Sequence, residues 1–320
     1  MKYFSFASGV AGLELGFPKD WECVGFAEID KYASAVLKYH FPNIKNYGDV
    51  YAIKWNEIPD FDLLSGGTPC QDLSISGKRA GLAGARSRLF FEFIRALKEK
   101  KPKYFIWENV KGALSSNGGF DFARVLLEFS EAGYNLWWQV LNAKDFGVPQ
   151  NRERIFIVGF RERSPPEVFF EPENSGKADE LQEQTVNTIT TRYRASQAVG
   201  TYIIENQQHA QNKPIEITKN QAQGYRVYST EGIAIALRSN GGGEGGKTGL
   251  YQISSKQIRR LTPVECERLM SWKDNWTRYG IDEKGNKFEL SDTQRYRLIG
   301  NGVVSNVVKE IVDKVILWKP

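Results

Sequence analysis

Hydrophobic and polar positions in the first half of the chain follow two alternating patterns. Short runs rich in β-branched and aromatic residues predict six strands, at residues 3–6, 23–27, 61–64, 104–107, 136–142 and 155–160. Between them, apolar residues at helical spacing predict helices around residues 89–97 and 122–129, the second ending before Gly133. Strands that alternate with helices are typical of a parallel sheet covered on both faces, so we expect a doubly wound, mostly parallel α/β fold.

The alternation stops after about Arg163. Ser164-Pro165-Pro166 is followed by an acidic, polar stretch without either periodicity, and residues 185–251 are rich in Thr, Gln, Asn and Gly. We therefore expect a larger α/β domain made of residues 1–170 and 293–320, and a smaller, loop-rich domain made of residues 171–292.

Helical signals return near the end of the chain. Thr262 as N-cap, Pro263 at the first helical position and Glu265 three residues after the cap predict a capping box. A last helix is expected at residues 306–317 and should pack on the larger domain. Its predicted buried side consists of Val307, Val308, Ile311, Val312, Val315 and Ile316.

The composition is that of an ordinary globular protein, with 41% hydrophobic and 25% charged residues among 320. No run of about 18 apolar residues and no leader peptide is present, so we expect no membrane span and a cytoplasmic location. Cys23, Cys70 and Cys266 are too few and too widely spaced for a disulfide framework or a zinc site, and we expect no metal. A net charge of +5 is compatible with a polyanionic partner without proving one.

Glycines follow the first predicted strand, in residues 6–17. Backbone can approach a ligand closely there, which favours a nucleotide-like cofactor, although a tight strand-to-helix turn has the same pattern. Glu28 after the second strand suits ribose hydroxyls, and Asp49 suits an adenine amine. The alternative for both acids is simple solvation at the surface.

Three further groups lie where the carboxyl edge of the sheet is expected. Cys70 follows Pro69 beyond the third strand, Glu108 follows the fourth, and two arginines, Arg152 and Arg154, precede the sixth. A lone cysteine is more often a small buried hydrophobe, and acids and arginines form salt bridges, so none of these residues is decisive alone.

Together, however, six ordered segments resemble the motifs of the C5-cytosine DNA methyltransferases. The segments are residues 8–13, 69–71, 108–110, 150–154, 260–266 and 300–304. The resemblance spans nearly the whole chain, and the short length is similar to that of bacterial or phage modification enzymes. It implies S-adenosylmethionine as cofactor, double-stranded DNA as partner, a catalytic domain at 1–170 plus 293–320 and a target-recognition domain at 171–292.

The resemblance also implies a mechanism. Cys70 adds to carbon 6 of a flipped-out cytosine, which makes carbon 5 nucleophilic toward a sulfonium methyl group. Glu108 near N3 and Arg154 near O2 stabilise the charge that enters the ring, and Arg152 steadies the thiolate or the base.

By the same resemblance, the cofactor site would be formed by Phe6, Ser8, Gly9, Val10, Gly12, Glu28, Ile29, Asp49, Val50, Pro69, Leu89, Asn301 and Gly302. The family usually has an aromatic residue where this chain has Ala7, and we expect Phe6 or Ile29 to stack on the adenine instead. Ala11 replaces a usual glycine, and Gly302 stands where serine or alanine is common.

DNA contacts would come from Gln71, Ser74, Ser76, Lys78, Arg79, Gln223, Arg226, Arg238, Asn240 and Gly243. Residues 74–81 resemble the mobile loop that closes over the flipped base. Arg226 can donate two hydrogen bonds to guanine, and Gln223 can fill the gap that the base leaves, so we expect a guanine 3′ of the target cytosine.

The sequence leaves three alternatives open: a transfer RNA cytosine-5 methyltransferase of the same fold, a non-catalytic DNA-binding module, and a dinucleotide oxidoreductase. We expect a monomer, with a cognate restriction endonuclease as a functional rather than a physical partner.

Overall fold

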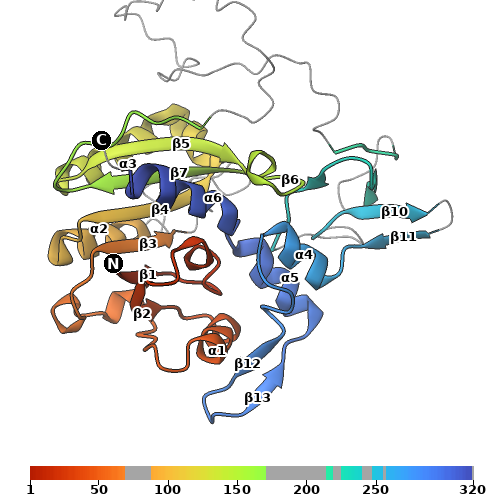
Figure 1. Cartoon of the computed structure of the whole chain (residues 1–320), viewed down its shortest axis with the longest axis horizontal. Helices are drawn as coiled ribbons and strands as arrows, with labels where there is room; N and C mark the ends of the chain where they lie inside the picture. Colours follow the sequence, from red (N-terminus) through yellow and green to blue (C-terminus); the bar gives the residue numbers. More distant parts are fainter. Residues whose placement is uncertain (69–87, 171–213, 219–224, 240–246, 255–256, 319–320) are drawn as a thin grey trace, which may run out of the picture.

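The computed structural model describes residues 1–68, 88–170, 214–218, 225–239, 247–254 and 257–318. A six-stranded sheet with the order β2-β1-β3-β4-β7-β5 forms its centre (Figure 1). The strands are β1 (Lys2–Phe6), β2 (Glu22–Ala27), β3 (Leu63–Gly67), β4 (Tyr104–Val110), β5 (Asn135–Asn142) and β7 (Glu153–Phe160). The first four strands pair in parallel, whereas β7 is antiparallel to both β4 and β5. The predicted α/β fold is confirmed, with a mixed and mostly parallel sheet.

All six predicted strands exist, but none has the predicted bounds. β1, β2 and β5 each begin one residue earlier than predicted, and β7 begins two residues earlier. β3 begins two residues later than predicted and continues to Gly67, and β4 continues three residues beyond Trp107. Glu108 and Asn109 end the apolar run, yet their backbones still pair with Phe156 and Ile155 of β7. A hydrophobic pattern does not detect strand positions that carry functional polar side chains.

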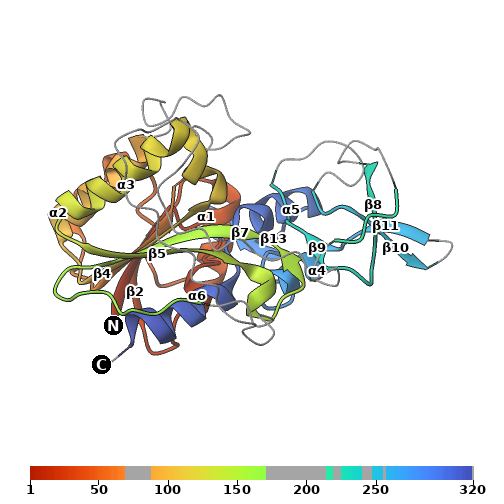
Figure 2. The same ribbon diagram turned by 90° about the horizontal axis from the view of Figure 1, so that it is seen from above.

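Helices cover both faces of the sheet. Figure 2 shows α2 (Arg88–Lys100) and α3 (Phe120–Glu131) on one face and α6 (Ser305–Ile311) on the other. Alternate residues of each strand enter two separate cores, so that Phe105 packs toward α2 and α3 while Ile106 packs with α6. A helix that was not predicted, α1 (Lys31–His40), begins at Asp30, whose carboxylate accepts hydrogen bonds from two backbone amides.

The last helix begins one residue earlier than predicted and continues as a π-helical turn over Val312–Ile316. All six residues of its predicted apolar side are buried, and the helix packs on the larger domain as expected. The Arg163 guanidinium donates hydrogen bonds to the carbonyls of Ile316 and Trp318 and so holds its C-terminal end.

The remaining elements are short. They are β6 (Gln150–Asn151), β8 (Val227–Ser229), β9 (Ala234–Ile235), β10 (Leu250–Ser254), β11 (Gln257–Arg260), α4 (Pro263–Leu269), β12 (Tyr279–Ile281), β13 (Lys287–Glu289) and α5 (Asp292–Asn301). A three-stranded sheet, β11-β10-β8, lies apart from the central sheet, with α4 and α5 between them (Figures 1 and 2). The division into domains at residues 171 and 292 stays a prediction.

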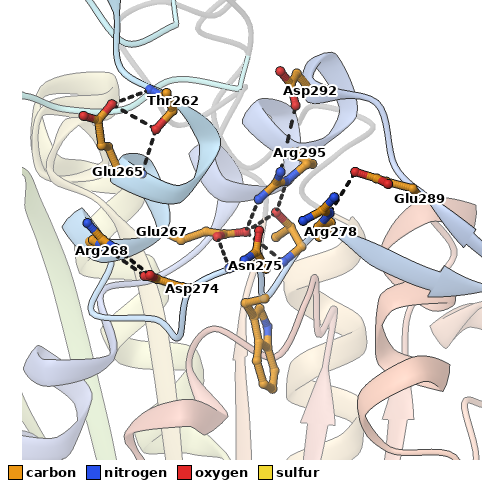
Figure 3. Close-up of polar contacts among 12 residues, drawn as sticks. Thr262, Glu265, Glu267, Arg268, Asp274, Asn275, Arg278, Glu289, Asp292 and Arg295 are labelled. Carbon is orange, nitrogen blue, oxygen red and sulfur yellow. Dashed lines mark hydrogen bonds and ion pairs between the residues drawn. The ribbon is translucent and has the colours of Figure 1, made fainter.

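Polar contacts fix α4 and α5. The capping box of α4 is confirmed, with the Glu265 carboxylate folded back onto Thr262 (Figure 3). Glu267 is fully buried and accepts a hydrogen bond from the Arg295 guanidinium of α5 at 3.1 Å and another from the Asn275 amide at 2.7 Å. None of the helices in the described residues is long and apolar enough to cross a membrane.

Candidate active site

Glu108 and Arg154 form an ion pair near the carboxyl end of β4 in the central sheet. Arg154 lies opposite Val110 in the β4–β7 ladder, so Glu108, two residues earlier, projects from the same face. Arg154 Nε is 3.0 Å from Glu108 Oε1, and only 19% and 13% of the two side chains are exposed. The sequence placed both residues near the carboxyl edge, and the structure brings them into contact.

Burial raises the pKa of the Glu108 carboxyl, and the nearby guanidiniums of Arg154 and Arg152 only partly oppose this shift. The acid therefore retains its proton to a higher pH than an exposed glutamate does. A carboxyl group in this state can share a proton with a ring nitrogen of a substrate.

The chain that leads to Cys70 leaves the sheet beside Glu108. Gly67 is the direct partner of Glu108 in the β3–β4 ladder. The next residue, Thr68, is buried, its hydroxyl accepts a hydrogen bond from Trp107 Nε1 at 3.2 Å, and its carbonyl accepts one from Asn109 Nδ2 at 3.3 Å. Pro69 and Cys70 themselves lie outside the described residues. The two neighbouring strands thus fix the starting point of the segment that carries the thiol.

The glycine turn after β1 is tied to the end of β2. Gly9 has a φ of 55°, and its amide donates a hydrogen bond of 2.7 Å to Glu28 Oε2. The other carboxylate oxygen of Glu28 accepts the Asp30 amide, also at 2.7 Å. A Cβ atom at Gly9 would have no neighbour within 4 Å, so open space lies beside the turn. The turn therefore has room for a ligand next to a half-buried carboxylate.

Comparisons with known proteins agree with this geometry. Residues 1–317 match the family described as C-5 cytosine-specific DNA methylase. The chain belongs to this family. It is 35% identical over 319 residues to the type II methyltransferase M.HhaI of Haemophilus parahaemolyticus, covering 97% of this chain and 93% of that protein. It is 31% identical over 316 residues to M.NlaX of Neisseria lactamica, covering 98% and 95%. The Entamoeba histolytica methyltransferase EhMeth, with a TM-score of 0.70, 16% identity and coverage of 98% and 97%, has the same fold.

The protein is therefore a DNA (cytosine-5-)-methyltransferase that uses S-adenosylmethionine as methyl donor. This assignment favours DNA methylation over the oxidoreductase, the non-catalytic module and the transfer RNA enzyme. The open turn at Gly9 and the half-buried carboxylate of Glu28 fit a nucleoside-containing cofactor.

One expectation for the cofactor site of this methylase is wrong. Phe6 is fully buried, where its ring stacks on Trp55 and meets Phe93 edge-to-face. Its side chain therefore cannot stack on an adenine. Ile29 is 75% exposed and remains available for stacking on the adenine. Tyr51, two residues after Asp49, is 51% exposed and is available as well.

Gly12 and Gly302 both pack against the ring of Trp272, so their lack of a side chain leaves space for this tryptophan. A Cβ atom on either glycine would lie 2.4 Å from ring carbons of Trp272. This ring also donates a hydrogen bond from Nε1 to the carbonyl of Val303 at 3.0 Å. Trp276 from the same loop donates one to the carbonyl of Val10, which is itself buried. Neither tryptophan was predicted as part of the site, because nothing near them in the sequence indicates their partners.

The other predicted cofactor residues occupy varied positions. Ser8 hydrogen bonds to the carbonyl of Ser5, and the Asp49 carboxylate accepts the Tyr51 amide. Val50 is buried, Leu89 is partly buried near the start of α2, and Asn301 is exposed at the end of α5. Their contacts with the cofactor stay predictions.

Arg152 lies close enough to influence Glu108 electrostatically, but its guanidinium is directed elsewhere. It donates hydrogen bonds to the carbonyls of Leu237 at 2.9 Å, Gly300 at 3.1 Å and Gly302 at 2.7 Å. With 3% of the residue exposed, Arg152 joins distant backbone segments. The role that we expected for it, as a group steadying the thiolate or the base, is not visible in these contacts.

Two of the predicted DNA contacts are described. Arg226 lies just before β8, with Nε 3.6 Å from Glu216 Oε1, and Arg238 is exposed. The predicted contacts outside the described residues are Gln71, Ser74, Ser76, Lys78, Arg79, Gln223, Asn240 and Gly243.

Proposed function

We propose that the enzyme methylates carbon 5 of a flipped-out cytosine within a short duplex DNA sequence, through a covalent bond between Cys70 and carbon 6. The observation that carries this proposal is the shielded Glu108–Arg154 pair, which lies beside the strand end from which the chain continues to Cys70. An acid with a raised pKa and a fixed cation are the groups that a negatively charged cytosine ring requires.

The reaction begins when the Cys70 thiolate adds to carbon 6 and the ring electrons move toward carbon 5, N3 and O2. Glu108 shares its proton with N3, and the Arg154 guanidinium stabilises charge at O2. S-adenosylmethionine supplies the electrophilic methyl group that carbon 5 then takes. Loss of the carbon 5 proton to a base restores the double bond between carbons 5 and 6 and expels the thiolate.

The cytosine must leave the base stack before this chemistry, at a cost of about a few kcal/mol for unstacking and unpairing. We propose that residues 74–81 close over the flipped base and that the segment around Arg226 and Arg238 reads the flanking bases. Arg226, held near Glu216, would donate two hydrogen bonds to a guanine 3′ of the cytosine.

The relatives named type II methyltransferases suggest that a restriction endonuclease of the same specificity accompanies this enzyme as a functional partner. We propose that the methyltransferase itself acts as a monomer.

Bisulfite sequencing of DNA from a strain that expresses the protein tests the proposed reaction and substrate. We expect methylcytosine at one short motif in which guanine follows the cytosine, and none in a strain that expresses Cys70→Ser. Methylation before A, C or T would refute the role of Arg226. Unchanged methylation by Cys70→Ser would refute the covalent mechanism.

A further inference from the structure

The five residues from Gln150 to Arg154 connect two distant parts of the molecule. At one end, Gln150 and Asn151 form β6 and pair in parallel with Ala234 and Ile235 of β9. At the other end, Arg154 contacts Glu108. One short, extended segment therefore joins the catalytic pair to the backbone that precedes Arg238.

Two buried side chains on this segment hold the backbone of a single residue, Leu237, through its amide and its carbonyl. Gln150 Oε1 accepts a hydrogen bond from the Leu237 amide at 3.2 Å, and Arg152 Nη1 donates one to the Leu237 carbonyl at 2.9 Å. Side chains two residues apart in an extended segment project to the same side, which explains why both reach Leu237.

The same two side chains also hold the ends of α4 and α5. Gln150 Nε2 donates a hydrogen bond to the carbonyl of Leu269 at 2.8 Å, at the end of α4. Arg152 Nη2 donates to the carbonyls of Gly300 and Gly302, at the end of α5. Gln150 is 0% exposed and Arg152 is 3% exposed, so water cannot replace these hydrogen bonds.

The backbone of Arg238 is confined on its other side. A Cβ atom at Gly300 would lie 2.3 Å from the carbonyl carbon of Arg238 and from the amide nitrogen of Ser239. Arg238 cannot shift toward α5, and it cannot move away without breaking the contacts of Leu237. Although Arg152 Nε has no partner among the described residues, any shift of Leu237 would break the buried hydrogen bonds to Gln150 and Arg152 together, which favours one arrangement of the segment.

We propose that Gln150 and Arg152 are positioning residues, which keep the DNA-facing segment that ends at Arg238 in register with the Glu108–Arg154 pair. Contact between this segment and the correct bases would then favour the productive geometry of the pair. The inference rests on the proposed role of this segment in reading DNA.

The test measures single-turnover methylation with the full-length protein. The substrates are a duplex that carries the motif mapped by bisulfite sequencing and the same duplex with the base pair after the cytosine exchanged. We expect Gln150→Met to slow methylation of the mapped duplex by about 10- to 100-fold, because small misplacements of catalytic groups have effects of this size. The rate ratio between the two duplexes should fall in the same variant, whereas the Kd for S-adenosylmethionine stays within about threefold, a change of less than 1 kcal/mol.

Gln139→Met is a matched control. The Gln139 side chain also holds the backbone of one residue. It accepts a hydrogen bond from the Phe170 amide at 3.0 Å and donates one to the Phe170 carbonyl at 2.8 Å, but Phe170 lies outside the network around Leu237. This variant should keep both the rate and the ratio of the wild type. Arg152→Lys serves as a second variant if Gln150→Met does not fold. Lysine keeps the positive charge but lacks the two guanidinium nitrogens that donate to separate carbonyls.

The pH dependence separates positioning from general loss of stability. Arg152→Met removes a cation that lowers the pKa of Glu108, so the alkaline limb of the rate should move to higher pH, while Arg152→Lys should leave it in place. If the wild type discriminates between the duplexes and Gln150→Met and Arg152→Lys keep both its rate and its ratio, this inference is wrong although the proposed function stands. If the wild type shows no discrimination, the proposed reading of the base after the cytosine fails first.

Discussion

The substitution Gly302→Ala tests whether the glycines near the cofactor turn serve Trp272. The new Cβ atom would lie 2.4 Å from two ring carbons of Trp272, whereas carbon atoms in a protein core pack at about 3.5–4.0 Å. The ring must therefore retreat by about 1 Å or more. Trp272 is only 4% exposed, and its indole nitrogen is bound to the Val303 carbonyl, so such a movement disturbs a packed core.

Overpacking of this kind costs about 1–3 kcal/mol, and loss of the indole hydrogen bond adds about 0.5–1.5 kcal/mol. We expect Gly302→Ala to lower the free energy of unfolding by about 1.5–4.5 kcal/mol, the sum of these two effects. Urea denaturation measures this change directly.

A double-mutant cycle with Trp272→Phe identifies the cause. Phenylalanine lacks the ring carbons that meet Gly302, so the two substitutions together should destabilise less than the sum of their separate effects, by at least about 1 kcal/mol. A loss below about 0.5 kcal/mol for Gly302→Ala, the range usual for harmless surface changes, would refute the reasoning. Strict additivity in the cycle would refute it equally.

Three further predictions concern single residues. Lys101, exposed just after α2, has a φ of 51°, a left-handed conformation that costs any residue other than glycine about 1–2 kcal/mol. Lys101→Gly should therefore raise the urea concentration at the midpoint of unfolding, whereas Lys101→Ala should not. Burial raises the pKa of Glu14, whose Oε1 accepts a hydrogen bond from the Ser65 hydroxyl at 2.8 Å. Between the pKa of Glu14 in the unfolded chain and its higher pKa in the folded protein, the folded state holds a proton that the unfolded chain has lost. The stability that is fully present below the unfolded-state pKa should therefore be lost as pH rises through the folded-state pKa. Glu14→Gln should flatten this pH dependence of the free energy of unfolding, measured by denaturation at a series of pH values. Burial also raises the pKa of Glu108, so the methylation rate should fall as pH rises through that pKa, because the proton for N3 is lost; a rate in single-turnover assays that climbs steadily to alkaline pH would contradict this role.

Local patterns predicted much of the fold because the alternation of side chains along strands and helices is a local property. Six strands, the capping box at Thr262 and the buried side of the last helix were all predicted correctly. The end of β4 was not, because Glu108 and Asn109 are polar although they remain in the ladder. Their position in the sheet depends on β7, about 45 residues later in the sequence.

The candidate site was predictable as a set of residue types but not as a set of contacts. Glu108 and Arg154 were identified from their order in the chain, and the structure adds that they touch. Gly12 packs against Trp272, and Arg152 donates a hydrogen bond to Leu237. Both partners lie far away in the sequence, so no local pattern predicts these contacts. Phe6 illustrates the opposite error, since an aromatic residue beside a glycine turn suggested stacking but packs in the core.

The central claim is that the thiol of Cys70 bonds covalently to cytosine. Replacing the target cytosine by 5-fluorocytosine blocks loss of the substituent at carbon 5, so the thiol cannot be expelled after methyl transfer. We expect DNA with this base, incubated with the enzyme and S-adenosylmethionine, to form a complex that survives denaturation, and mass spectrometry should locate the DNA on the peptide that contains Cys70. A complex attached to another residue, or one that forms equally with Cys70→Ser, would contradict the account.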